Sequence, residues 1–121
     1  MNYEKQWPPK FKGDGKTYVF DIDGTLCEKT DGDYTKAAPF NNRIQKVNDL
    51  YDQGNTIILF TARGMGRTEG NSQAAIRMFF DMTLEQMTQW GVKFHRLILG
   101  KPAADFYIDD KGMKDVEFFG D

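Results

Sequence analysis

The sequence is poor in cysteine and in long apolar runs, and each scarcity excludes a class of protein. Of its 121 residues one is a cysteine, Cys27, so an internal disulfide and a cysteine-based zinc site are both excluded. No apolar run is long enough to span a bilayer, and residues 1–16 lack the apolar core of a signal peptide, so we interpret them as a polar lead-in. The formal net charge of −2 does not favour a membrane surface or a nucleic acid as partner. We therefore expect a cytoplasmic protein.

The remaining residues, 17–121, have the length and the hydrophobic content, 40% of the chain, of one compact domain without repeats. Helices are predicted from about Asn42 to Gly54, less clearly over 71–80, and over 83–91, where Thr83 and Gln86 match a capping box. Short apolar segments alternate with these helices and predict strands at 17–22, 56–60, 96–99 and 105–108.

This alternation predicts an α/β fold: a small doubly wound, Rossmann-like parallel sheet of about four to five strands with helices on both faces. In such a fold the ligand site lies outside the carboxyl ends of the strands.

Two aspartates follow the first predicted strand, one residue apart, in Asp21-Ile22-Asp23-Gly24-Thr25. Neighbouring carboxylates repel each other, and a sheet terminus gives them little water. The pair becomes favourable if a divalent cation lies between them and if one acid attacks while the other moves a proton. From this motif alone, an ordinary Asp-Gly turn remains an equal alternative.

Three further polar features follow at the ends of the later strands. The second strand ends in Thr61-Ala62-Arg63-Gly64, which offers a hydroxyl, backbone amides and a guanidinium to phosphate oxygens. Lys101 precedes the fourth predicted strand, and Asp109-Asp110 follows it. Each feature alone has an ordinary structural explanation, but their joint occurrence in this order indicates one site.

Together these motifs resemble the four-motif signature of the haloacid dehalogenase superfamily in its phosphatase form, from Tyr18 to Lys111. Within that superfamily the chain is similar to small phosphatases encoded with capsule and surface-polysaccharide biosynthesis genes, through the segments DIDGTLC, LYDQG, TARG and GKPAADFYIDDK.

The resemblance implies a reaction through an aspartyl-phosphate. Asp21 is then the nucleophile, and Asp23 protonates the leaving oxygen and later deprotonates the attacking water. The resemblance further implies Mg²⁺ as cofactor, held by Asp21, the backbone carbonyl of Asp23 and the Asp109 carboxylate. Asp110 is expected to fix a metal-bound water or Lys101.

The resemblance also implies the phosphate-binding groups. Thr61, with the Ala62 amide, is expected to bind the transferring phosphoryl group, and Lys101 to offset the charge of nucleophile and phosphate. Arg63 is the better candidate, ahead of Arg67, for gripping a second anionic group of the substrate.

The segment 26–39, called the flap below, is too short for a cap domain, so the chain resembles the capless subgroup. An uncapped site either accepts a large substrate or is closed by a neighbouring subunit, so a homo-oligomer is a hypothesis. Tyr34 of the flap either reaches the site or packs beside it. Cys27 is expected to be a packing residue and His95 a polar residue at a strand edge.

The function expected from this is a magnesium-dependent phosphomonoester hydrolase acting on a sugar phosphate or a related small precursor of surface-polysaccharide synthesis. The alternatives are a polynucleotide 3′-end or nucleotide phosphatase and a non-catalytic module that binds phosphorylated ligands. Phosphotransfer to another acceptor and phosphonate chemistry use the same scaffold.

Overall fold

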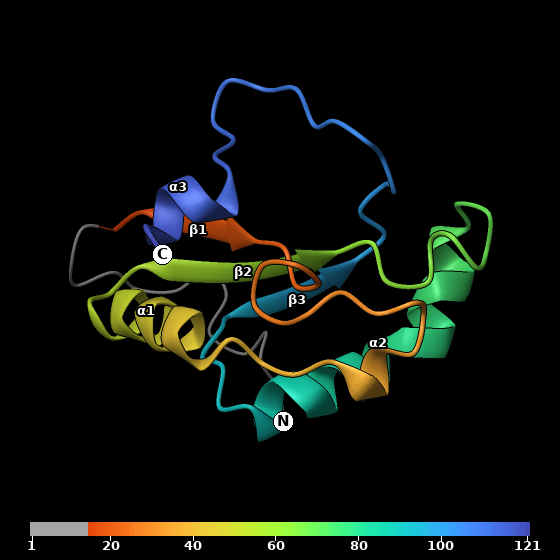
Figure 1. Ribbon diagram of the computed structural model, residues 1–121, viewed down its shortest axis with the longest axis horizontal. Helices are drawn as coiled ribbons and strands as arrows, with labels where there is room; N and C mark the ends of the chain where they lie inside the picture. Colours follow the sequence, from red (N-terminus) through yellow and green to blue (C-terminus); the bar gives the residue numbers. More distant parts are fainter. Residues whose placement is uncertain (1–14) are drawn as a thin grey trace.

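The structure is a computed structural model that describes residues 15–121, so the polar lead-in predicted for 1–16 lies almost entirely outside the described residues. The strands are β1 (Thr17–Phe20), β2 (Thr56–Thr61) and β3 (Arg96–Leu99). The helices are α1 (Asn41–Asp52), α2 (Ser72–Gln89) and α3 (Asp115–Phe119), with a short 3₁₀ helix at Tyr34–Lys36 in the flap (Figure 1). The predicted α/β class is confirmed. No helix within 15–121 is both long and apolar enough to cross a membrane.

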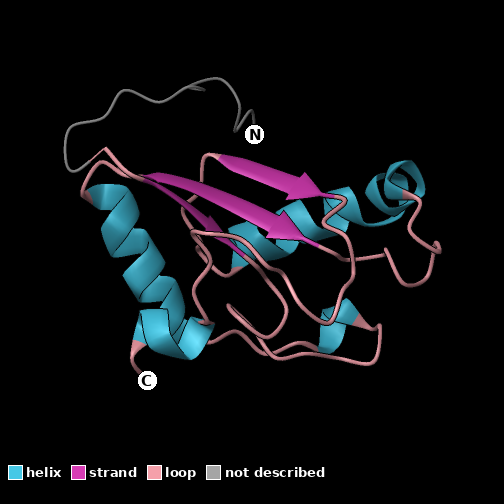
Figure 2. Ribbon diagram, turned by 90° about the horizontal axis from the view of Figure 1, so that it is seen from above, coloured by secondary structure: helices cyan, strands magenta, loops and turns pink. Residues whose placement is uncertain are grey.

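The three strands form a parallel sheet in the order β1-β2-β3. In this order, right-handed crossovers, the usual hand for parallel strands, place both connecting helices on the same side of the sheet. In Figure 1, α1 and α2 lie below the sheet and α3 lies above β1. The arrowheads of all three strands point the same way in Figure 2, so their carboxyl ends meet at one edge.

The core lies between the central strand and the helices that cover it. Ile57 and Leu59 of β2 are fully buried, and they belong to one cluster with Val47 of α1 and Met87 of α2. Ile22 is also fully buried, although it follows the end of β1. Ile22 lies between Asp21 and Asp23, so core packing fixes the backbone directly beside both aspartates.

The prediction of a separate helix beginning at Thr83 is wrong. Residues 72–89 form one continuous helix, which Asn71 caps by accepting a hydrogen bond from the Ala74 amide at 3.0 Å. The span contains neither glycine nor proline, so nothing stops the helix before Thr83. Thr83 and Gln86 are instead buried within the helix, where they face the rest of the protein.

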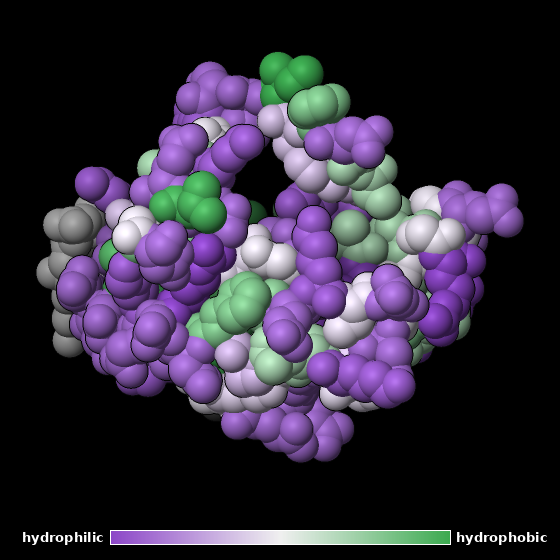
Figure 3. All heavy atoms as spheres, in the orientation of Figure 1, coloured by the Kyte–Doolittle hydropathy of each residue, from purple (hydrophilic) through white to green (hydrophobic). Residues whose placement is uncertain are grey.

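The fourth strand predicted at 105–108 is also not formed: the described sheet has three strands, and these residues have no strand structure. Phe106 and Ile108 are 82% and 95% exposed. A β-type sequence becomes a strand only where a neighbour accepts its hydrogen bonds. The aromatic rings of Phe118 and Phe119 in α3 pack on Phe20 of β1 instead, and Figure 3 shows the molecule hollowed beneath the loop that carries 105–108.

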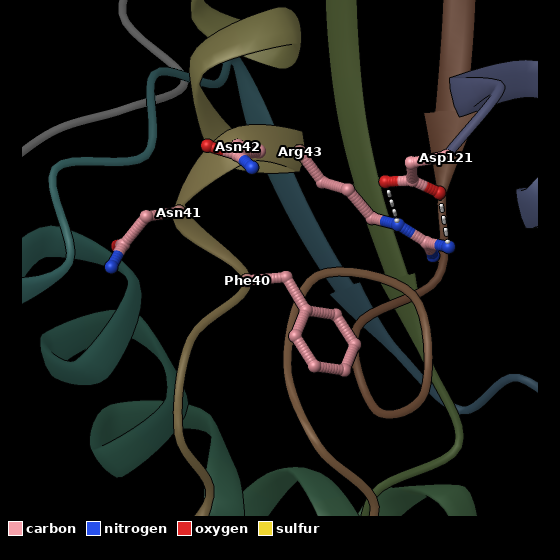
Figure 4. Close-up of a pocket in the computed structure, with 5 residues that line it drawn as sticks. All are labelled: Phe40, Asn41, Asn42, Arg43 and Asp121. Carbon is pink, nitrogen blue, oxygen red and sulfur yellow. Dashed lines mark hydrogen bonds and ion pairs between the residues drawn. The ribbon is translucent and has the colours of Figure 1, made fainter.

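One arginine attaches α3 and the following residues to α1. Arg43 donates to the Asp121 carboxylate from Nε at 3.0 Å and from Nη2 at 2.9 Å, as the dashed lines in Figure 4 show. Its Nη1 donates to Asp115 at 2.7 Å, and the guanidinium lies over the Phe119 ring at 4.8 Å. Arg43 also lines the shallow pocket of about 450 Å³ drawn in Figure 4, between the start of α1 and Asp121.

These ion pairs make stability depend on pH. The hydrogen bonds from Arg43 lower the pKa of Asp115 and of Asp121 below 3.8. A lowered folded-state pKa means that the stabilisation is complete above the unfolded-state value and is lost as the pH falls through the folded-state value. We expect Arg43→Met to lower the urea midpoint at pH 7 and to reduce the further loss of stability on acidification below about pH 4.

Urea unfolding, monitored by circular dichroism at pH 7, 4 and 3, measures both the midpoint at pH 7 and the loss of stability on acidification. The control is Lys93→Met, which removes an exposed ion pair to Asp52 and should change the midpoint little. If the stability of Arg43→Met fell with pH as much as that of the wild type, these ion pairs would contribute nothing to the acid sensitivity of the fold.

Candidate active site

Six of the residues predicted from the strand ends line one cavity of about 460 Å³ at the carboxyl edge of the sheet. These residues are Asp21, Asp23, Thr61, Ala62, Arg63 and Lys101. They come from the segments that follow β1, β2 and β3, which the parallel register brings side by side. The cavity lies where ligands bind in open parallel sheets.

Asp21, which follows β1, forms an ion pair with Lys101, which follows β3. Lys101 Nζ lies 3.6 Å from Asp21 Oδ1, and both side chains are largely withdrawn from solvent. Burial raises the pKa of Asp21 above its usual value, while the charge of Lys101 opposes this shift. The pair therefore holds a carboxylate that is poorly hydrated, close to a single ammonium group.

The turn after Asp21 depends on Gly24. Its φ of +84° lies in the left-handed region that glycine adopts without strain, and the Thr25 and Leu26 amides donate to the Ile22 carbonyl at 3.0 and 2.8 Å. This tight turn returns the chain toward the sheet, and it leaves the carboxylates of Asp21 and Asp23 on the same cavity.

Asp23 is paired with Arg63 through both carboxylate oxygens. Arg63 Nε donates to Oδ2 at 2.9 Å and Nη2 donates to Oδ1 at 3.0 Å. The Arg63 side chain has no exposed surface, whereas that of Asp23 is 22% exposed. The sequence predicted that Arg63 grips an anionic group of the substrate, but the structure gives its guanidinium to Asp23 instead.

Thr61 and Lys101 are also joined to each other. The Lys101 amide donates to the Thr61 carbonyl at 3.2 Å, and the Thr61 hydroxyl oxygen accepts from the Arg63 amide at 3.1 Å. With its oxygen used as an acceptor, the hydroxyl retains a proton that can be donated. Ala62, the neighbour predicted to bind phosphate through its amide, lines the same cavity.

Asp109 and Asp110 do not reach this cavity. Asp109 is exposed, and its Oδ1 accepts from the amides of Lys111, at 2.8 Å, and Gly112. Asp110 pairs with Lys111 at 3.2 Å in an exposed position. Among residues 15–121 no three His, Cys, Asp or Glu side chains lie close enough together to hold a metal ion. The structure thus brings together two of the three residues predicted to hold magnesium.

Tyr34 of the flap both reaches the cavity and packs beside it. It lines the cavity, its Oη accepts a hydrogen bond from the Gly64 amide at 2.9 Å, and its ring meets Phe79 edge-on at 5.1 Å. Gln86 Nε2 donates to the Tyr34 carbonyl at 2.8 Å. The flap is therefore bound to α2 and to the loop after β2.

Sequence reasoning missed the contribution of α2 to this site. Thr83 Oγ1 lies 3.3 Å from Arg63 Nη1, so a helix interior supports the ion pair. The available signal was the spacing of two polar residues, Thr83 and Gln86, one helical turn apart beside the buried Met87.

His95 lies outside this cavity. Its ring stacks on Tyr51 with the ring centroids 4.6 Å apart, and its Nδ1 accepts a hydrogen bond from the Ile57 amide.

The solved structures that are similar to the chain include the following two. A protein from Vibrio cholerae, solved as an MCSG target, is 29% identical over 86% of this chain and 87% of its own, with a TM-score of 0.79. The D,D-heptose 1,7-bisphosphate phosphatase of B. bronchiseptica, crystallised with magnesium and phosphate, is 18% identical over 74% of this chain and 52% of its own, with a TM-score of 0.50. No family model and no curated protein matches the chain. What these similarities establish is the fold, a Rossmann-like α/β arrangement with a parallel sheet.

Cys27 is fully buried beside Asp23, and the structure indicates that its thiol is inert. Burial, and then the negative charge of Asp23, raise the pKa of the thiol from 9.0 to about 12. Because the thiolate is the reactive form, we expect iodoacetamide at pH 8 to alkylate the native protein at least roughly a thousandfold more slowly than the urea-unfolded protein. Mass spectrometry over time measures both rates, and equal rates would contradict the burial of this side chain.

Proposed function

We propose that the protein is a phosphomonoester hydrolase in which Asp21 attacks phosphorus. The observation that carries the proposal is the arrangement of Asp21, Asp23, Thr61 and Lys101 around one cavity, with an ammonium group 3.6 Å from the Asp21 carboxylate. A phosphate dianion needs positive charge and hydrogen-bond donors around it before a carboxylate can approach. In this proposal Lys101 and the Thr61 hydroxyl supply these groups.

The reaction consists of two displacements at phosphorus. In the first, an Asp21 oxygen forms a bond to phosphorus while the bond to the ester oxygen breaks, and Asp23 gives its proton to that oxygen. In the second, Asp23 takes a proton from water, the water oxygen attacks phosphorus, and Asp21 is released as a carboxylate. Lys101 balances the charge on Asp21 and on the phosphoryl group throughout.

The oxygen donors present fit magnesium in part. Mg²⁺ binds through one or two carboxylates, waters and substrate phosphate oxygens, and the cavity is lined by Asp21 and Asp23, whose carboxylate and backbone carbonyl respectively are the proposed ligands. Both oxygens of the Asp23 carboxylate are already paired with Arg63. When bound, the ion would neutralise charge on the phosphoryl oxygens. The heptose phosphatase of similar fold was crystallised with magnesium, which supports this assignment.

We propose a small phosphorylated sugar as the substrate class, with surface-polysaccharide synthesis as its setting. The fold shared with a phosphatase named for a heptose bisphosphate supports this choice. Hydrolysis rates on a panel of sugar phosphates, nucleotides and 3′-phosphorylated oligonucleotides test the choice directly. A preference for oligonucleotides would favour a polynucleotide 3′-end phosphatase instead.

The role of Asp21 predicts a trapped intermediate. We expect wild-type protein, quenched in acid during turnover of p-nitrophenyl phosphate with Mg²⁺, to carry one phosphoryl group on Asp21, found by peptide mass spectrometry. Asp21→Asn should lose at least about 10³-fold in kcat and carry no label. Asp49→Asn, which alters an exposed aspartate of α1, is the matched control and should retain full activity. Full activity in Asp21→Asn would overturn the mechanism.

The predicted role of Asp109 as a magnesium ligand is tested by titration. If Asp109 joins the site during turnover, Asp109→Asn should raise the Mg²⁺ concentration for half-maximal activity by about tenfold or more, since one anionic ligand is lost. The matched control is Asp110→Asn at the neighbouring exposed carboxylate, which should have a smaller effect. An unchanged Mg²⁺ dependence in Asp109→Asn would show that the cavity binds the ion without it.

A further inference from the structure

The ion pair between Arg63 and Asp23 has a geometry that fixes one orientation of a carboxylate. We propose that Arg63 is the positioning residue for Asp23 in proton transfer, and that Thr83 of α2 and Tyr34 of the flap hold Arg63 in place. This inference rests on the function proposed above, because it assigns a role in that reaction.

The first argument is the two-point contact. Nε and Nη2 of the guanidinium donate to the two different oxygens of Asp23, at 2.9 and 3.0 Å. Two parallel bonds between planar groups fix the rotation of the carboxylate, which a single bond or a point charge does not. Each oxygen retains a second lone pair, and Asp23 is 22% exposed toward the cavity, so one oxygen can still exchange a proton.

The second argument is the enclosure of the guanidinium on its other sides. Nη1 lies 3.3 Å from Thr83 Oγ1 and 3.6 Å from Met82 Sδ, both on α2. The Tyr34 ring covers the guanidinium, with Arg63 Cζ 4.7 Å from the ring centroid. The side chain has no exposed surface, so it cannot rotate to a substrate without breaking these contacts.

The third argument is that the covering ring is itself fixed. Its Oη accepts from the Gly64 amide, directly after Arg63, and its ring meets Phe79 edge-on. Gly64 has a φ of +81°, and a Cβ there would lie 2.6 Å from Phe79 Cδ2. The loop after β2, the flap and α2 are therefore packed in one arrangement around Arg63.

This arrangement has a measurable consequence for different leaving groups. An alkoxide leaves poorly unless it receives a proton, so hydrolysis of an alkyl phosphate depends strongly on a correctly placed Asp23. p-Nitrophenolate leaves without that help. The second displacement is common to both esters and also needs Asp23 as a base, so the first displacement is compared alone, by leaving-group release in a single turnover with enzyme in excess. If Arg63 positions Asp23, its loss must slow the release of an alkyl alcohol more than the release of p-nitrophenolate. If Arg63 bound the substrate instead, its loss would raise KM for both.

The experiment compares Arg63→Met, Arg63→Lys and Asp23→Asn, with the double variant Arg63→Met/Asp23→Asn, on glycerol phosphate and p-nitrophenyl phosphate. We expect Arg63→Met to lower the single-turnover rate of glycerol release roughly 10–100-fold, and that of p-nitrophenolate release by about threefold or less. Arg63→Lys should not rescue, since lysine cannot make the two-point contact. The double variant should be no slower than Asp23→Asn alone, because the two residues act as a unit.

The matched control is Arg77→Met, which removes an exposed arginine of α2 and should change neither rate. Thermal unfolding monitors the fold of every variant. If Arg63→Met does not fold, Thr83→Val and Tyr34→Phe decide the question, since each removes one hydroxyl that holds the arrangement. Both should lower the single-turnover rate of glycerol release by a few-fold more than that of p-nitrophenolate release.

The two proposals fail separately. A wild-type protein that hydrolyses neither ester would overturn the proposed function. An active wild-type protein would overturn the positioning role alone in either of two cases. In the first, folded Arg63 variants or supporting variants slow the single-turnover release of both leaving groups equally. In the second, their losses add to that of Asp23→Asn.

Discussion

The buried ion pair between Arg63 and Asp23 is the contact on which the rest of the site depends. A guanidinium without exposed surface is stable only where a carboxylate and further acceptors surround it, and removing one partner of such a pair typically costs about 3–5 kcal/mol. Here Arg63 lies in the loop after β2, and its partners come from three other segments: the turn after β1, the flap and the interior of α2. The pair therefore forms only when all four are in place.

The same constraint resolves the repulsion between the two aspartates. Asp21 and Asp23 are one residue apart, and each faces its own cation from a different strand end: Lys101 after β3 and Arg63 after β2. The two cations differ as the proposed roles require. Lysine is a compact charge that can balance a changing phosphoryl group, whereas arginine makes a rigid two-point contact that fixes a proton donor. Two chemically equal carboxylates thus have different surroundings, which suit the different roles proposed for them.

Much of this arrangement could be predicted from the sequence, because it follows from local patterns. Three apolar strands and the helix after Asn42 have clear periodicity, and parallel strands bring Asp21, Thr61 and Lys101 to one edge. Two elements could not be predicted in this way. Thr83 and Gln86 match a capping box, but the residues before them allow the helix to continue, so the local signal had no effect. The apolar segment 105–108 has strand composition, yet a strand needs a partner, which periodicity does not reveal.

The partner of Arg63 could not be predicted from the sequence either, because tertiary packing decides it. A guanidinium after a strand suits a substrate phosphate and a buried carboxylate equally well.

The most direct test of the account is a crystal structure of the protein with Mg²⁺ and beryllofluoride, a mimic of the phosphoryl group. The account predicts beryllium bonded to an Asp21 oxygen, with fluorines near Lys101 Nζ and the Thr61 hydroxyl and with the contact between Arg63 and Asp23 intact. Beryllofluoride bonded to Asp23, or held by an Arg63 side chain that has left Asp23, would contradict it.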